Sequence, residues 1–344
     1  MKQLIAPAEK ILPPEPRSIP EELVVAPNSR AVQNEYARGN YVRLGPGVYV
    51  PTQIWLGADA SFKLLALCSA KVLRSPQTVF AGEAALFLAG LPVFGTPGGI
   101  LTVTDAHSRL GAEKGTLAAS SSASGPLQTS VAAAPRIFRK QVRQVDPVRT
   151  GDFTVVQLPD AVADVAGRLP LLRALTVADG LARFGNHLGL QLSHAHDAAD
   201  ALTFASHVSR AHQVLDLARP GAATPFETGS RCVMLQHGFQ EPVLQRPHFD
   251  EIGRFIGFTD THWEDRNTSG EADGRIKYTD PRILGGRSLE DVLLEEKIRQ
   301  QRIEATGLRI IRWQWSDMIH PDRLVRILRL ADIPAHPSWR PRLL

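Results

Sequence analysis

Short β-type runs and helical patterns alternate in the first sixty residues. Residues 41–50 read as two β segments around a Gly-Pro-Gly turn, which predicts a hairpin. Before it, residues 21–26 are predicted as a short helix, and Ser29 is placed to cap a second helix over residues 30–38, which Gly39 would end. Two helices followed by a hairpin are the elements of a winged helix-turn-helix, a DNA-binding fold.

The middle of the chain predicts a mixture of helices and strands. Helices are indicated at residues 61–73, 161–168 and 171–188, and strands at residues 136–143 and 153–158. Residues 115–135 are low in complexity and are predicted to form a loop. The strand at 136–143 carries Arg139 and Lys140, which could extend a phosphate-binding surface or lie on a solvated strand face.

The last part of the chain predicts strands that carry acidic residues. Strands are expected at 254–260, 269–273 and 308–315, and helices at 225–238 and 289–306, the second closed by Gly307. The predicted fold class is therefore mixed α/β (α+β). It comprises an arm and winged helix at residues 1–58, a mixed α/β region at 59–217, and a mixed sheet flanked by helices at 218–344.

Three acidic side chains are expected to gather on two of these strands. Glu271 and Asp273 are two residues apart and so share a face of their strand, and antiparallel pairing would bring Asp260 beside them. Carboxylates this close repel one another unless a positive group offsets the repulsion. That group would be a divalent cation bound by oxygen ligands, or nearby lysine and arginine side chains.

This arrangement resembles the PD-(D/E)XK nucleases, and more closely the small domains akin to very-short-patch-repair endonucleases. The resemblance covers roughly residues 218–317 and implies that Asp260, Glu271 and Glu227 hold Mg²⁺ or Mn²⁺ for hydrolysis of DNA. Asp273 stands where many relatives have the lysine that positions the attacking water. Lys277 or Lys297 would then take that role, and His262 would be a possible acid or base.

The N-terminal region resembles the AbiEi-type antitoxins, a family of transcriptional regulators. The runs that carry the likeness are residues 41–51 and 78–92, and the resemblance implies a repressor that binds its own promoter and has a cognate toxin. The DNA contacts expected from the predicted winged helix are Arg30, Gln33, Asn34 and Arg38 on the second helix and Arg43 on the wing. The expected partner is double-stranded DNA, with a homodimer as a further possibility.

Charge is distributed unevenly along the chain. Residues 1–150 carry 16 Lys and Arg against 10 Asp and Glu, while residues 151–344 carry 23 against 25, so the net charges are +6 and −2. A basic first part is typical of a module that holds phosphates, although such an excess also occurs on proteins that never meet nucleic acid. The two cysteines, Cys68 and Cys232, are expected to be buried thiols in a cytoplasmic protein, and no segment is long and apolar enough to span a membrane.

Two functions of different class are consistent with these patterns. The first is a Mg²⁺-dependent DNA endonuclease of a defence or repair system, directed to DNA by its winged helix. The second is a non-enzymatic AbiEi-type regulator in which the nuclease-like acids are solvated or paired with arginines. Four histidines, His194, His196, His207 and His212, lack the spacing of a helical zinc site and are expected to have no metal.

Overall fold

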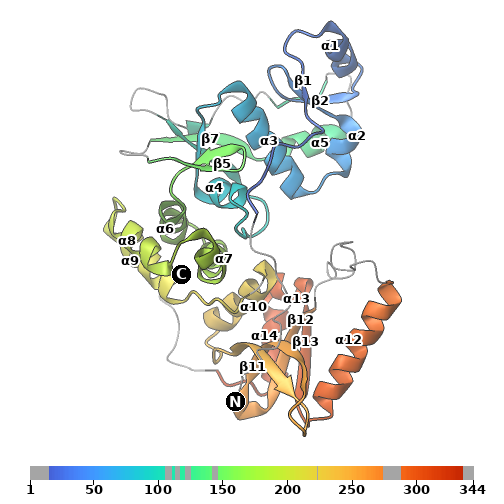
Figure 1. Ribbon diagram of the computed structural model, residues 1–344, viewed down its shortest axis with the longest axis vertical. Helices are drawn as coiled ribbons and strands as arrows, with labels where there is room; N and C mark the ends of the chain where they lie inside the picture. Colours follow the sequence, from blue (N-terminus) through green and yellow to red (C-terminus); the bar gives the residue numbers. More distant parts are fainter. Residues whose placement is uncertain are drawn as a thin grey trace. The chain divides into compact units, whose positions relative to one another are not determined.

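The computed structural model describes residues 15–104, 111–112, 117–120, 125–141, 146–222, 224–273 and 288–335. These residues form a mixed α/β protein, as predicted. The chain divides into two compact units. The first unit joins Pro14–Leu169 to Phe184–Asp216, and the second joins Pro170–Arg183 to Leu217–Leu344. Helix α7 (Leu171–Phe184), from the predicted middle region, therefore packs mainly within the second unit (Figure 1).

The first unit begins with a small three-stranded sheet of order β1-β3-β2. Its elements are β1 (Val24–Val25), α1 (Arg30–Ala37), β2 (Tyr41–Gly45), β3 (Val48–Pro51), α2 (Thr52–Gly57) and α3 (Ala60–Arg74). The predicted hairpin and the helix at residue 30 are confirmed. The helix predicted at residues 21–26 is wrong, because Val24 and Val25 pair antiparallel with β3. Adjacent β-branched residues favour such pairing.

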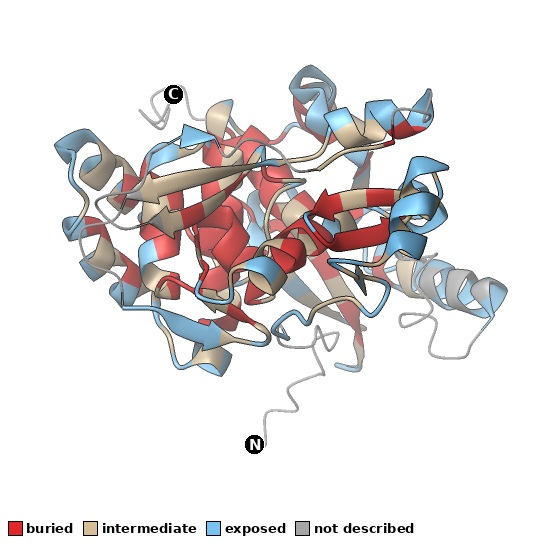
Figure 2. Ribbon diagram, turned by 90° about the horizontal axis from the view of Figure 1, so that it is seen from above, coloured by how far each residue is buried: buried red, intermediate tan, exposed pale blue. Residues whose placement is uncertain are grey.

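The rest of the first unit is built on a six-stranded sheet of order β6-β7-β5-β4-β9-β8. The strands are β4 (Val79–Ala81), β5 (Gly99–Thr104), β6 (Gly111–Ala112), β7 (Arg136–Gln141), β8 (Val148–Thr150) and β9 (Phe153–Val155). The helices are α4 (Gly82–Leu88), α5 (Pro126–Ala132), α6 (Leu158–Arg168), α8 (Leu192–Asp200) and α9 (Ala205–Asp216), with a 3₁₀ turn at Gly185–Leu188. Figure 2 shows that buried residues gather on the strands and on the helix faces that pack against them.

The second unit holds a four-stranded sheet of order β10-β11-β12-β13, in which the last pair is parallel and the others are antiparallel. Its strands are β10 (Val243–Phe249), β11 (Phe255–Trp263), β12 (Thr268–Asp273) and β13 (Arg309–Gln314). Its helices, besides α7, are α10 (Pro225–Gln236), α12 (Leu289–Glu304), α13 (Trp315–Ile319) and α14 (Pro321–Leu330), with a 3₁₀ turn at Glu264–Arg266.

Two tryptophans near the end of the second unit differ in their surroundings. Trp313 is 1% exposed, and its Nε1 donates to Ser230 Oγ of α10 at 2.7 Å, so it packs in the core. Trp315 was expected on the same strand, but it begins α13 and is 43% exposed. The strand ends there because Gln314 and Asp317 form a capping box that starts the helix.

A buried ion pair joins α7 to α10. Arg231 Nη2 lies 2.6 Å from Asp179 Oδ1, and both side chains are almost fully buried. Asp179 also accepts from the Arg219 N–H and the Thr228 hydroxyl, and Arg231 has a second partner in Glu241. Burial raises the pKa of the Asp179 carboxyl, and Arg231 opposes that rise. The pair therefore holds together segments from both stretches of chain that make up this unit.

Removal of the Asp179 carboxylate is expected to destabilise the second unit strongly. Asp179→Ala leaves the buried Arg231 guanidinium without its closest counter-ion, which typically costs about 3–5 kcal/mol. Chemical unfolding followed by tryptophan fluorescence measures the change, since Trp263 and Trp313 lie in this unit. Glu251→Ala, at an exposed turn, is the control, and equal unfolding midpoints for the two variants would contradict this role of the pair.

Candidate nucleic-acid interface and nuclease-like centre

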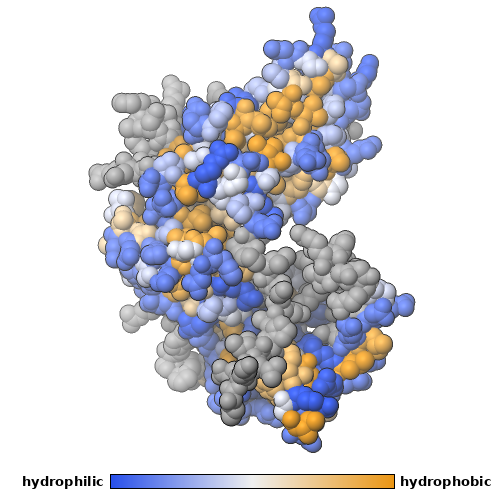
Figure 3. Space-filling model, viewed as in Figure 1, coloured by the Kyte–Doolittle hydropathy of each residue, from blue (hydrophilic) through white to orange (hydrophobic). Residues whose placement is uncertain are grey.

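Helix α1 presents one polar face outward. Ser29 caps the helix by accepting from the Val32 N–H at 3.3 Å, and Gly39 follows it with a φ of 87°. Three of the predicted DNA contacts, Arg30, Gln33 and Asn34, are at its exposed positions, and the fourth, Arg38, is the exposed C-cap residue and forms an ion pair with Glu35. Figure 3 shows a hydrophilic surface over this helix. Arginine and carboxamide side chains at i, i+3, i+4 and i+8 lie on the same side of a helix and can address base edges and phosphates.

The hairpin formed by β2 and β3 packs against α1. Gly47, with a φ of 76°, sits so close to Pro27 that an added Cβ would lie 2.7 Å from its Cα. Arg43 on β2 was predicted to touch DNA, but its guanidinium carbon lies 5.4 Å from the centre of the Tyr36 ring, and the residue is half-buried. This cation–π contact gives Arg43 a role in holding α1.

A short segment from the middle of the chain also holds α1 in place. Ala118 exchanges two backbone hydrogen bonds with Arg43, at 3.0 and 2.9 Å. The Tyr36 hydroxyl donates to the Ala119 carbonyl at 3.0 Å, and Ser120 Oγ donates to the Ala37 carbonyl at 2.9 Å. This contact could not be predicted from the sequence, because it joins segments about eighty residues apart and no motif marks it.

Both cations predicted on β7 are half-buried and have partners within the protein. Lys140 forms an ion pair with Asp164 of α6, which also pairs with Arg168. Arg139 is half-buried and has a partner within the protein. The interpretation of this strand as a solvated or structural face is therefore better supported than that of a phosphate surface.

The predicted elements of the nuclease-like region occur in the predicted order, with one further strand, β10, that was not predicted. A helix, three strands, a helix and a final strand follow one another as α10, β10, β11, β12, α12 and β13. Asp260 lies on β11, Glu271 and Asp273 on β12, and Glu227 in the first turn of α10, whose N-cap is Thr224. Lys277 lies outside the described residues.

Two of the predicted carboxylates lie around one glutamine. Gln245 Nε2 is 3.3 Å from Glu227 Oε2 and 3.4 Å from Asp260 Oδ1. The other Asp260 oxygen accepts from the Ala272 N–H at 2.8 Å. Gln245 has a φ of 49°, a backbone conformation rare outside glycine, and it stands opposite Asp260 on β10. Sequence analysis did not single out Gln245, since a glutamine on a strand carries no signal of its own.

Glu271 is held by two arginines. Arg299 Nη2 of α12 lies 2.8 Å from Glu271 Oε1, and Arg312 of β13 donates through Nε and Nη2 to Oε2 at 3.1 and 2.6 Å. Arg299 also donates to the Phe258 carbonyl of β11 at 2.6 Å. Both carboxylate oxygens are thus engaged by guanidinium N–H groups, which are strong, charge-assisted donors.

Glu271 and Asp260 contact different partners. Trp313 donates to Ser230 of α10, and neighbours along a strand point to opposite faces. Arg312 and its in-register partner Glu271 therefore point away from α10, and Glu271 pairs with Arg299 on α12. Figure 1 shows α10 and α12 as separate helices beside the strands of this unit. Asp260 instead contacts Gln245, which bridges it to Glu227 on α10.

The expected convergence of Asp260, Glu271 and Glu227 on one metal ion is not seen among the described residues. No group of three His, Cys, Asp or Glu side chains in the described part of the chain is arranged to hold a metal ion. Glu271 has both oxygens occupied by arginines, and Asp273 and Lys297 are exposed at separate points on β12 and α12. As arranged, these residues do not fit a Mg²⁺ ion.

A chain of hydrogen bonds runs beside Glu271 across three strands. His248 Nε2 lies 2.8 Å from Thr259 Oγ1, Thr259 donates to Ser269 Oγ at 3.0 Å, and Ser269 Oγ lies 2.9 Å from His262 Nδ1. Burial, with His262 and Arg246 nearby, lowers the pKa of His248 to about 4. Burial and Arg246 also lower the pKa of His262. Both rings are then neutral at pH 7, so the hydroxyls of Thr259 and Ser269 can each donate one hydrogen bond.

The histidines His194, His196, His207 and His212 each have a contact within the protein. His196 and His212 share a hydrogen bond between their Nδ1 atoms at 2.8 Å, and His212 Nε2 lies 2.8 Å from Asp200. His194 accepts from the Gln191 N–H at the start of α8, and His207 packs edge-on against Phe204.

No model of a known protein family matches this chain, and no curated protein matches it in sequence. None of the described helices combines the length and the apolar character needed to cross a membrane. Cys68 and Cys232 are buried free thiols, as expected, and burial raises the pKa of Cys232 to about 12.

Acidification is expected to destabilise the second unit through His248 and His262. In the unfolded chain both protonate near a pKa of 6.5, whereas folded His248 takes up a proton only near pH 4. Their contribution to stability is therefore complete above pH 6.5 and is lost as the pH falls from there to about 4. Denaturant unfolding across this range measures the loss, which His248→Gln should reduce and the exposed-site control His320→Gln should not. Identical pH dependence in both variants would exclude His248 as a source.

Proposed function

We propose that this protein binds double-stranded DNA through α1 and its supporting hairpin and does not hydrolyse it. The observation that carries the proposal is the outward face of α1, where Arg30, Gln33, Asn34 and Arg38 stand exposed on a helix fixed at several points. Such a face can place arginines and amides in the major groove, while the hairpin lies near the backbone.

The contacts of Glu271 with two arginines support the absence of cleavage. A carboxylate must leave its protein partners before it can coordinate a cation, and here Glu271 would leave three N–H donors from Arg299 and Arg312. Removing the carboxylate would also leave both guanidinium groups close together without their common counter-ion. The ion pairs therefore favour the arrangement in which Glu271 binds the two arginines and no metal ion.

This function is that of a transcriptional regulator of the AbiEi type, in which the second unit serves as a scaffold or a docking partner. The resemblance of residues 41–51 and 78–92 to that family supports it, together with the net charge of +6 over residues 1–150. A cognate toxin and a homodimer are part of the same proposal.

A DNA nuclease is the second candidate. The order of helices and strands from α10 to β13 favours it, as does the closeness of Glu227 and Asp260 around Gln245. For this candidate, Glu271 would have to exchange its arginines for a cation when DNA binds.

Loss of the α1 arginines is expected to weaken DNA binding and its dependence on salt. Each phosphate contact removed lowers the slope of log affinity against log salt by about 0.9, so Arg30→Gln with Arg38→Gln should lower it by up to about 1.8. Affinity at about 0.1 M salt should fall on the order of tenfold or more. Fluorescence anisotropy with duplexes of random sequence and of the protein's own promoter measures both quantities.

The matched control is Arg266→Gln, an exposed arginine in the 3₁₀ turn of the second unit. It should leave affinity and slope unchanged. If wild type binds duplex DNA but the α1 variant binds it equally well, α1 is not the contact surface. If wild type fails to bind any duplex, the proposed function is wrong.

A further inference from the structure

Helix α14 is a rigid amphipathic helix at the end of the described chain. Its apolar residues Leu324, Val325 and Leu328 are buried, and it packs against α10, α13 and β13. These contacts use the apolar face within the protein, so that face cannot insert into a membrane surface. The opposite face is fixed in position by the same packing.

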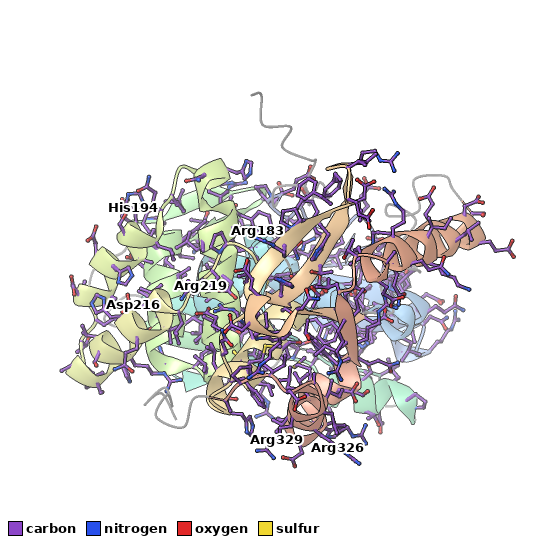
Figure 4. All side chains as sticks on the ribbon, turned by 90° about the horizontal axis from the view of Figure 1, so that it is seen from below. Arg183, His194, Asp216, Arg219, Arg326 and Arg329 are labelled. Atoms are coloured by element: carbon purple, nitrogen blue, oxygen red, sulfur yellow. The ribbon has the colours of Figure 1, made fainter. Side chains whose placement is uncertain are left out.

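That opposite face carries three arginines, one at every third position of the helix. Arg323, Arg326 and Arg329 are all exposed, and Figure 4 shows Arg326 and Arg329 extending outward from the helix. Residues three apart on a helix are separated by about 4.5 Å of axial rise and turn by about 60°, so these side chains fan out along a curved line. The helix has one acidic residue, Asp322, against the three arginines.

These arginines differ from most others in the second unit by having no partner within the described protein. Arg219, Arg231, Arg246, Arg254, Arg299, Arg302 and Arg312 each pair with an acidic side chain, and Arg183 and Arg309 donate to backbone carbonyls. Arg173 also has an interaction within the protein. Among the described arginines of this unit, only Arg266 shares the unpaired state of the α14 set.

We propose that the arginine face of α14 is a second contact surface for double-stranded DNA, one that binds the phosphate backbone. The surface carries guanidinium groups and no carboxamide, so it holds phosphates and does not read base edges. A curved row of cations on a fixed helix matches a continuous polyanion better than the discrete acids of a folded protein surface.

This surface lies outside the predicted DNA contacts, all of which are in the first unit. The inference rests on the proposed function, since it assumes that the protein meets DNA. It gives the second unit a part in binding even though Glu271 is engaged by arginines.

Neutralising the three arginines tests this surface. The variant Arg323→Gln/Arg326→Gln/Arg329→Gln, in the full chain, should bind a duplex of random sequence on the order of tenfold or more weakly at about 0.1 M salt. The slope against log salt should fall by up to about 2.7. The matching triple Arg→Lys variant keeps the charge and should retain most of the affinity. Equal thermal midpoints for both variants show that α14 remains folded.

Each result distinguishes this inference from the function on which it rests. If the triple Gln variant binds with wild-type affinity and slope while the α1 variant does not, the α14 surface is wrong and the proposed function stands. If both variants lose affinity and Arg266→Gln does not, both are supported. If wild type binds no duplex, both are wrong. If the triple Gln variant loses affinity for poly-glutamate but keeps wild-type affinity and salt slope for DNA, the surface binds acidic polypeptides and the DNA assignment fails.

Discussion

The ion pairs between Glu271 and the guanidinium groups of Arg299 and Arg312 link three elements of the second unit. They tie β12 to α12 on one side and to β13 on the other, through a carboxylate that is about one-tenth exposed. A buried carboxylate is costly unless it is paired, so Glu271 depends on both arginines. The same two arginines occupy the oxygens of the carboxylate that a metal-dependent nuclease would need most.

Around this constraint, the molecule holds its polar side chains in two distinct ways. Side chains that keep the fold are paired with opposite charges, fully buried in Asp179 with Arg231 and half-buried in Lys140 with Asp164. The side chains proposed to meet DNA stand exposed on helices fixed from behind. Helix α1 is held by Tyr36, Arg43 and residues 117–120, and α14 by its buried leucines and valine. Rigid presentation lowers the entropy lost on binding.

Local patterns predicted much of this fold, because caps, glycines and alternation are local signals. Ser29, Gly39 and Gly307 marked helix ends correctly, and the order of elements from α10 to β13, apart from β10, followed from the sequence. The helix expected at residues 21–26 was wrong because pairing with β3 overrode a weak local preference.

The candidate site was predicted less well than the fold. Spacing placed Asp260 and Glu271 on adjacent strands, but their surroundings depend on residues far away in sequence. Arg299 and Arg312 lie 28 and 41 positions from Glu271, and no local pattern reveals such a contact. Gln245, with its left-handed backbone, was equally hidden.

The central claim is that the protein holds DNA without cutting it, and plasmid nicking tests it most directly. Supercoiled plasmid would be incubated with excess full-length protein and Mg²⁺ or Mn²⁺, alongside samples containing EDTA and the Asp260→Ala and Glu271→Ala variants. The account predicts that the plasmid stays supercoiled in every sample while a gel-shift assay shows it bound. Nicking by wild type that EDTA and both substitutions abolish would contradict it and establish a metal-dependent nuclease.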